Sequence, residues 1–135
     1  MKAKLVEIEG IGEVYAAKLA AHGLKTTDDL LKAGDTPAKR KKLVEATGIS
    51  EKQILTWVNK ADLFRIKGVG TQFSDLLEEG GVDTVVELSK RVPENLHAKL
   101  AEVNAQKKLV RRLPTLREIT KWVEQAKQLP RAIQY

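Results

Sequence analysis

The chain of 135 residues has no cysteine and only two histidines, His22 and His97. Without a thiol it cannot form a disulfide, a thiolate metal site or an iron–sulfur cluster, and it has no cysteine nucleophile. Two histidines are also too few for a histidine-rich metal centre. The sequence therefore predicts neither a bound metal nor a cofactor.

Long apolar runs are missing as well. Lys18 and Lys25 interrupt the most apolar stretch, which falls short of the roughly 18 residues that a membrane-spanning helix needs. The start of the chain, up to Glu7, lacks the apolar run that precedes cleavage in a signal peptide. We therefore expect a cytoplasmic protein without a membrane partner.

Groupings of side chains that are typical of enzymes are absent too. Two acidic pairs, Asp28 with Asp29 and Glu78 with Glu79, lie on predicted helices. Neighbouring residues of a helix diverge by about 100°, so neither pair converges on a metal or an acid–base site. The sequence contains no Walker loop, no nucleophile elbow and no acidic cluster with nuclease spacing. We expect a protein that is not an enzyme and has no small-molecule substrate.

Positive charge, in contrast, is in excess and unevenly spread. The net charge is +6, and residues 105–135 alone carry +6 while residues 66–104 carry −3. A basic segment of this kind favours an anionic partner such as nucleic acid. The six aromatic residues are too few to supply both a core and a base-stacking platform, which argues against a single-strand binder of the stacking type.

The sequence is a duplication with an offset of 58 residues. Eight residues of the first copy recur unchanged in the second: Leu5, Ile8, Gly10, Gly12, Leu19, Gly23, Thr26 and Leu30 match Leu63, Ile66, Gly68, Gly70, Leu77, Gly81, Thr84 and Leu88. Further along, the offset changes from 57 to 65, which places an eight-residue insertion in the second copy between Val103 and Thr115.

Within each copy the apolar spacing is that of helices. Tyr15 and Leu19 are four residues apart, as are Phe73 and Leu77, so each pair lies on one helix face. Capping residues, first-turn prolines and glycine stops punctuate the pattern. We predict an all-α fold of about eight short helices, over residues 12–22, 27–33, 37–46, 50–63, 70–79, 84–91, 93–104 and 115–128.

One short motif, Leu-x-x-Ile-x-Gly-(Ile/Val)-Gly, occurs in both copies and reverses the chain between two helices. We call residues 8–12 the first hairpin and residues 66–70 the second hairpin. The apolar residue between the glycines, Ile11 or Val69, is expected to enter the core. The glycines permit the turn, and the amides that follow face outward at a helix N-terminus, where the helix dipole favours an anion. Each hairpin is therefore either a phosphate site made of backbone or simply a tight turn.

This frame resembles the helix-hairpin-helix motif of DNA-repair enzymes, polymerases and topoisomerases. Over essentially the whole chain, the pattern is similar to a bacterial family of tandem helix-hairpin-helix proteins that carries only a domain-of-unknown-function label. The resemblance implies a tandem duplication of helix-hairpin-helix lobes, with the fold of a SAM-like helical bundle. It implies no established activity.

The resemblance divides the chain into a first lobe, residues 1–63, and a second lobe, residues 64–135. A weaker third hairpin lies at residues 46–50 of the first lobe, where Gly48 is kept and Ser50 replaces the second glycine. Paired hairpins of this kind straddle a minor groove in the proteins that the sequence resembles.

In the second lobe the equivalent of the third hairpin is replaced by residues 104–114, which we call the basic insertion. If this segment is helical, Lys107 with Arg111 and Lys108 with Arg112 form one basic stripe. The alternative is that these residues pair with acidic residues of the same lobe, Glu78 and Glu79.

The two strong hairpins differ in charge. Acidic residues flank the first and basic or neutral residues flank the second: Glu7, Glu9 and Glu13 against Arg65, Lys67 and Thr71. Because a carboxylate near a phosphate is unfavourable, we predict that the second hairpin binds DNA and that the first is structural. A further basic run, Lys39-Arg40-Lys41-Lys42, fans around one helix turn and is expected to be solvated. Trp57 and Trp122 are expected in the core.

We therefore predict a non-enzymatic module that binds duplex or branched DNA by its phosphates, without reading sequence. The predicted contacts are Arg65, Lys67, Gly68, Val69, Gly70, Thr71, Lys107, Lys108, Arg111 and Arg112, with Gly10, Gly12, Gly48 and Ser50 at the other hairpins. The alternative is a protein-interaction scaffold, in which acidic surfaces meet a basic partner and nucleic acid plays no part.

Overall fold

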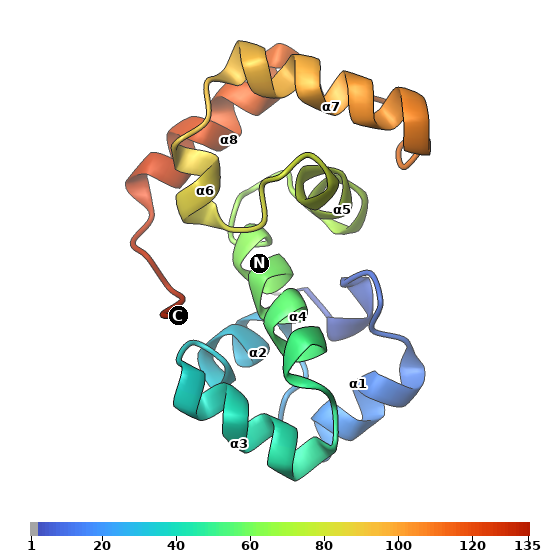
Figure 1. Cartoon of the computed structure of the whole chain (residues 1–135), viewed down its shortest axis with the longest axis vertical. Helices are drawn as coiled ribbons and strands as arrows, with labels where there is room; N and C mark the ends of the chain where they lie inside the picture. Colours follow the sequence, from blue (N-terminus) through green and yellow to red (C-terminus); the bar gives the residue numbers. More distant parts are fainter. Residues whose placement is uncertain (1–2) are drawn as a thin grey trace. The chain divides into compact units, whose positions relative to one another are not determined.

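The computed structural model describes residues 3–135, and it confirms the all-α prediction. Within that range a short 3-10 helix precedes eight α-helices (Figure 1). Their bounds are η1 Leu5–Glu7, α1 Glu13–Ala20, α2 Thr27–Ala33, α3 Pro37–Thr47, α4 Glu51–Leu63, α5 Thr71–Glu79, α6 Val85–Ser89, α7 Pro93–Lys107 and α8 Leu116–Gln128. Each α-helix falls within three residues of its predicted bounds.

Local capping explains why the helices begin where they do. The Thr115 hydroxyl accepts a hydrogen bond from the Glu118 amide, and the Glu118 carboxylate accepts one from the Thr115 amide. Thr84 accepts from the Glu87 amide in the same way at the start of α6. Such caps satisfy amides that have no partner within the helix, and each contributes about 1 kcal/mol.

The chain divides into two compact units. The first holds the described residues up to Asp62 together with the segment Ala132–Tyr135, and the second holds Leu63–Arg131. The prediction that residues 132–135 belong to the second lobe is wrong. They belong to the first unit because Ile133 is buried and the main chain of Gln134 is hydrogen-bonded to residues of that unit.

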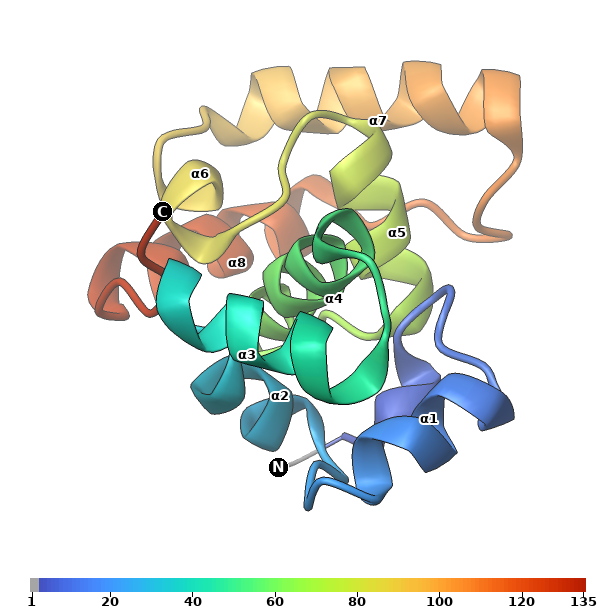
Figure 2. The same ribbon diagram turned by 60° about the horizontal axis from the view of Figure 1, so that its bottom comes forward.

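The first unit is built around a small apolar core. Helix α1 packs on η1 and α2 packs on α3 (Figures 1 and 2). Buried side chains from along this unit's sequence include Leu5, Ile8, Leu19, Leu30 and Ile54. Burying each such side chain stabilises the fold by about 1.5–3 kcal/mol.

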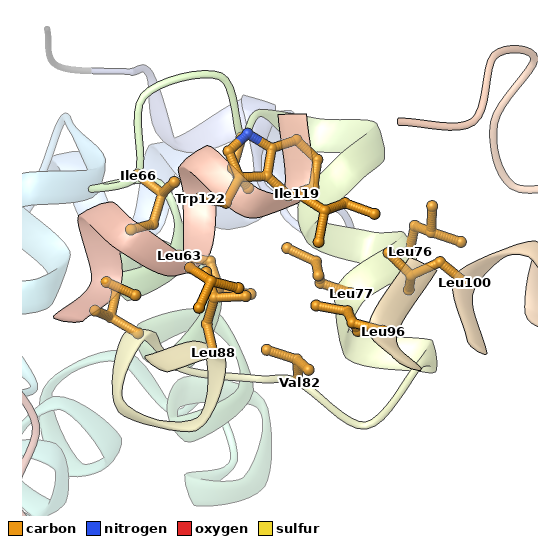
Figure 3. Packing of buried hydrophobic residues seen from close by; sticks show 14 of the residues in the cluster. Leu63, Ile66, Leu76, Leu77, Val82, Leu88, Leu96, Leu100, Ile119 and Trp122 are labelled. Carbon is orange, nitrogen blue, oxygen red and sulfur yellow. The ribbon is translucent and has the colours of Figure 1, made fainter. Parts of the chain in front are cut away.

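In the second unit α8 packs against α6 and α7, and α5 packs against α7. Figure 3 shows side chains of these helices meeting in one core, with Ile119 and Trp122 of α8 beside apolar residues of α5 and α7. Trp122 is buried, and so is its counterpart Trp57 in the first unit, as the sequence predicts. Across residues 3–135 no helix is both long enough and apolar enough to cross a bilayer.

Candidate nucleic-acid interface

The first and second hairpins have the same backbone geometry. Gly10 and Gly68 both have a φ of +97°, a conformation that side chains other than glycine rarely adopt. An indole nitrogen lies against each: a Cβ on Gly10 would be 3.2 Å from Trp57 Nε1, and a Cβ on Gly68 would be 3.1 Å from Trp122 Nε1. Glycine is therefore required at both positions by the backbone angle and by the close approach of tryptophan.

Each hairpin is closed by a hydrogen bond inside the loop. The Ile11 amide donates to the Ile8 carbonyl at 3.0 Å, and the Val69 amide donates to the Ile66 carbonyl at 3.1 Å. All four side chains are buried, as expected for the residue between the glycines. Val69 is one of the predicted phosphate contacts, and its amide is already bonded within the loop.

The second glycine of each hairpin begins a helix. Gly12 is the N-cap of α1 and Gly70 the N-cap of α5, and neither position has a side chain that could cap the helix. Gly12 and Gly68 are exposed, whereas Gly70 and Thr71 are half-buried. The N-termini of α1 and α5 thus keep their partial positive charge at the point where each hairpin meets its helix.

The third hairpin departs from the other two. Gly48 has a φ of +74° and Ile49 is buried, but no side chain lies within 4 Å of a Cβ at Gly48. The Ser50 hydroxyl accepts from the Gln53 amide at 3.2 Å. Because serine caps α4 in this way, the third hairpin offers one helix amide fewer to an anion.

An aromatic pair supports each strong hairpin. Tyr15 lies 5.1 Å from Trp57 between ring centres, and Phe73 lies 5.3 Å from Trp122, with similar tilts of 59° and 53°. A cation lies over the Tyr15 ring in the first unit and over the Phe73 ring in the second. Arg112 of the basic insertion lies 5.7 Å from the centre of the Phe73 ring. The insertion is therefore in contact with the helix that the second hairpin begins.

Arg112 is itself engaged by a carboxylate. Its guanidinium donates to both carboxylate oxygens of Glu118, at 2.6 and 3.1 Å. These hydrogen bonds, together with that from the Thr115 amide, lower the pKa of Glu118 to about 2, and Glu118 raises the pKa of Arg112. This fork joins the basic insertion to α8 through Arg112 and Glu118.

The basic stripe expected for a helical insertion does not form. Helix α7 ends at Lys107, and Lys108 has a φ of +51°, so the residues that follow leave the helix. Lys107 pairs with Glu79, as the alternative reading anticipated. Lys108 and Arg111 are exposed. Lys107 and Arg112 therefore form ion pairs with carboxylates of the second unit. Lys108 and Arg111 remain as candidates for binding phosphate.

Asn104 orders the insertion. Its side-chain amide donates to the Val110 carbonyl at 3.1 Å, and its carbonyl oxygen accepts from the Val110 amide at 2.9 Å. No sequence pattern indicates this role beyond the tendency of asparagine to bond nearby backbone.

Two residues beside the second hairpin are held by distant parts of the second unit. The Arg65 guanidinium donates to the Pro130 carbonyl at 3.0 Å, so it serves the path of the chain after α8. The backbone of Lys67 is clamped by Gln125, whose side-chain oxygen accepts from the Lys67 amide at 2.9 Å. The Lys67 side chain is exposed. The role of Gln125 could not be read from the sequence, because it acts across 58 residues.

Among residues 3–135 no three histidine, aspartate or glutamate side chains gather where they could hold a metal ion. A family model described as Domain of unknown function (DUF4332) matches residues 9–129. The chain belongs to this family. The matched range contains the glycines of the first and second hairpins and the basic insertion, whereas residues 132–135 lie beyond it. No curated protein and no solved structure matches the chain.

Proposed function

We propose that this DUF4332 protein is a non-enzymatic helix-hairpin-helix module of the bacterial cytoplasm that binds the phosphate backbone of duplex or branched DNA. The second hairpin is the binding site. Its contacts are the backbone at Gly68 and Gly70, the Lys67 side chain beside them, and the exposed insertion residues Lys108 and Arg111.

One observation carries this proposal. The N-terminus of α5 has no capping side chain, since Gly70 is the N-cap, and an exposed lysine precedes it on the same hairpin. Backbone amides and a helix dipole at such a terminus favour an anion, and Lys67 adds a mobile positive charge. The first hairpin has the same backbone, but it has Glu9 and Glu13 where the second has Lys67 and Thr71.

The proposed contacts predict sensitivity to salt. The proposed phosphate-binding cations are Lys67, Lys108 and Arg111, whose side chains are exposed. With about three phosphates neutralised, log affinity should fall with log salt at a slope of roughly −2.7. Fluorescence anisotropy with a labelled duplex and a labelled four-way junction measures this slope, and a flat response contradicts the proposal.

A pair of serine substitutions tests the hairpin itself. In Gly70→Ser the hydroxyl caps α5 as Ser50 caps α4, which removes one amide from an anion and raises stability by a few tenths of a kcal/mol. DNA affinity is therefore expected to fall while the fold is kept. Gly12→Ser makes the same change at the first hairpin and should leave affinity unchanged. If both substitutions weaken DNA binding equally, or if neither weakens it, the second hairpin is not the binding site.

A protein partner is the second candidate, and the first hairpin favours it. Val14 is 72% exposed and Val6 is 47% exposed, on either side of the acidic residues Glu9 and Glu13. Exposed apolar side chains in a segment that also carries carboxylates suit a basic protein better than a phosphate. If a folded, monodisperse sample binds neither the duplex nor the junction at low salt, a protein partner replaces DNA in the proposed function.

A further inference from the structure

The main chain of Gln134 holds the segment Ala132–Tyr135 to the rest of the first unit. The Gln134 amide donates to the Asp35 carbonyl at 2.8 Å, and the Gln134 carbonyl accepts from Arg40 at 2.9 Å. The Gln134 side chain itself is exposed. Asp35, in the loop before α3, and Arg40 of α3 therefore hold this residue by its backbone, and its side chain takes no part in these two hydrogen bonds.

Arg40 is the centre of the site. It was expected to be solvated together with its lysine neighbours, but it is only 4% exposed. Its guanidinium donates to two main-chain carbonyls, that of Gly34 at 2.8 Å and that of Gln134, and lies 5.8 Å from the centre of the Tyr135 ring. A buried guanidinium is costly unless acceptors surround it, and the segment supplies one of the two acceptors.

Two side chains of the segment anchor it on either side of Gln134. Ile133 is 2% exposed, and the Tyr135 hydroxyl donates to Asn59 Oδ1 of α4 at 2.8 Å. A buried isoleucine, an exposed glutamine and a tyrosine that is 61% exposed but bonded to α4 through its hydroxyl follow the alternation of an extended peptide. Main-chain hydrogen bonds for affinity and alternate side chains for specificity are how proteins bind peptides in extended form.

We propose that the first unit is a peptide-binding site for an extended segment with an apolar residue, any residue and then an aromatic residue, and that its own segment Ala132–Tyr135 occupies the site. Figures 1 and 2 show the end of the chain beside the start of α3, where Asp35 and Arg40 lie. The segment lies outside the matched family range, whereas Asp35 and Arg40 lie within it. This inference is independent of DNA binding.

A single substitution at the exposed residue Gln134 releases the segment Ala132–Tyr135 from the site. Gln134→Pro removes the amide that donates to Asp35, while Gln134→Ala keeps it and serves as the matched control. The probe is a fluorescein-labelled peptide of residues 129–135, followed by anisotropy. Because a tethered segment competes at an effective concentration in the millimolar range, the probe should bind Gln134→Pro about tenfold or more tightly than it binds the unaltered chain or Gln134→Ala.

A chain that ends at Arg131 provides the second arm, with its folding checked by circular dichroism. It lacks the occupant and should bind the probe as Gln134→Pro does. Adding Arg40→Met to it should abolish binding, whereas Lys41→Met, at the exposed neighbour on α3, should not. The proposal is overturned if neither folded variant binds the probe, or if the unaltered chain binds it equally well.

Discussion

The two strong hairpins present the same backbone with opposite chemistry. Gly10 and Gly68 have the same φ, and each lies against an indole nitrogen at nearly the same distance. Around this shared frame, Glu9 of the first hairpin is Lys67 in the second. The glycines and the buried isoleucine that set the turn have been kept in both copies, whereas the charged residues beside them have diverged.

The difference teaches which residues carry the fold and which carry function. A substitution at the buried interface between glycine and tryptophan changes the stability of a whole unit, because the turn and the core meet there. A substitution at an exposed flanking residue leaves the turn intact and alters only the charge that a partner encounters. The two hairpins can therefore be tested separately for fold and for binding.

The largest expected effect is on stability. Gly10→Ala and Gly68→Ala each force a side chain into a positive φ and against tryptophan, and each should lower the free energy of unfolding by about 1–3 kcal/mol. Urea unfolding of both variants measures the loss. If one substitution were tolerated and the other not, the two hairpins would not be structural equivalents.

Exchanging charge between the hairpins is expected to have an intermediate effect. Lys67→Glu gives the second hairpin the residue of the first and should weaken DNA binding roughly tenfold, since a surface charge beside a phosphate contributes about 1 kcal/mol. Glu9→Lys should strengthen it by less. Lys25→Glu, at an exposed lysine of the first unit, is the control for net charge. If Lys67→Glu and Lys25→Glu weaken binding equally, only overall charge is at work.

The smallest expected effect is a difference in pH dependence. Glu118 in α8 corresponds to Gln53 in α4, and only the glutamate titrates. Its pKa is about 2 in the fold against 4.5 for a free glutamate, so it stabilises the protein above pH 4.5, and this stabilisation is lost as the pH falls towards 2. Between pH 6 and pH 3 the unaltered chain should lose more unfolding free energy than Glu118→Gln. Equal losses would show that Arg112 does not hold Glu118 in solution.

Most of the helical architecture was predictable because its determinants are local. Threonine caps, first-turn prolines and the positive-φ glycines each act within a few residues along the chain, and the duplication supplied a second reading of the same pattern. The hydrogen bonds of Thr115 and Glu118 show how little of the tertiary structure such a prediction requires.

The candidate site was predicted less completely, because a basic side chain chooses its partner in three dimensions. Arg65 and Arg112 look alike in the sequence as phosphate ligands. The fold gives the first a carbonyl 65 residues away and the second a carboxylate on α8. Lys67 kept an exposed side chain although its backbone is clamped by Gln125. Nothing within a few residues of these positions distinguishes them.

By itself the sequence determined the helices, the repeat and the two glycine turns, since periodicity, capping and backbone freedom are properties of short stretches. Only the tertiary structure decided that Arg40 is buried and that residues 132–135 belong to the first unit. Both follow from contacts between segments more than 90 residues apart, such as that from Arg40 to Gln134. Contacts of that kind depend on how the whole chain packs, and no local pattern encodes them.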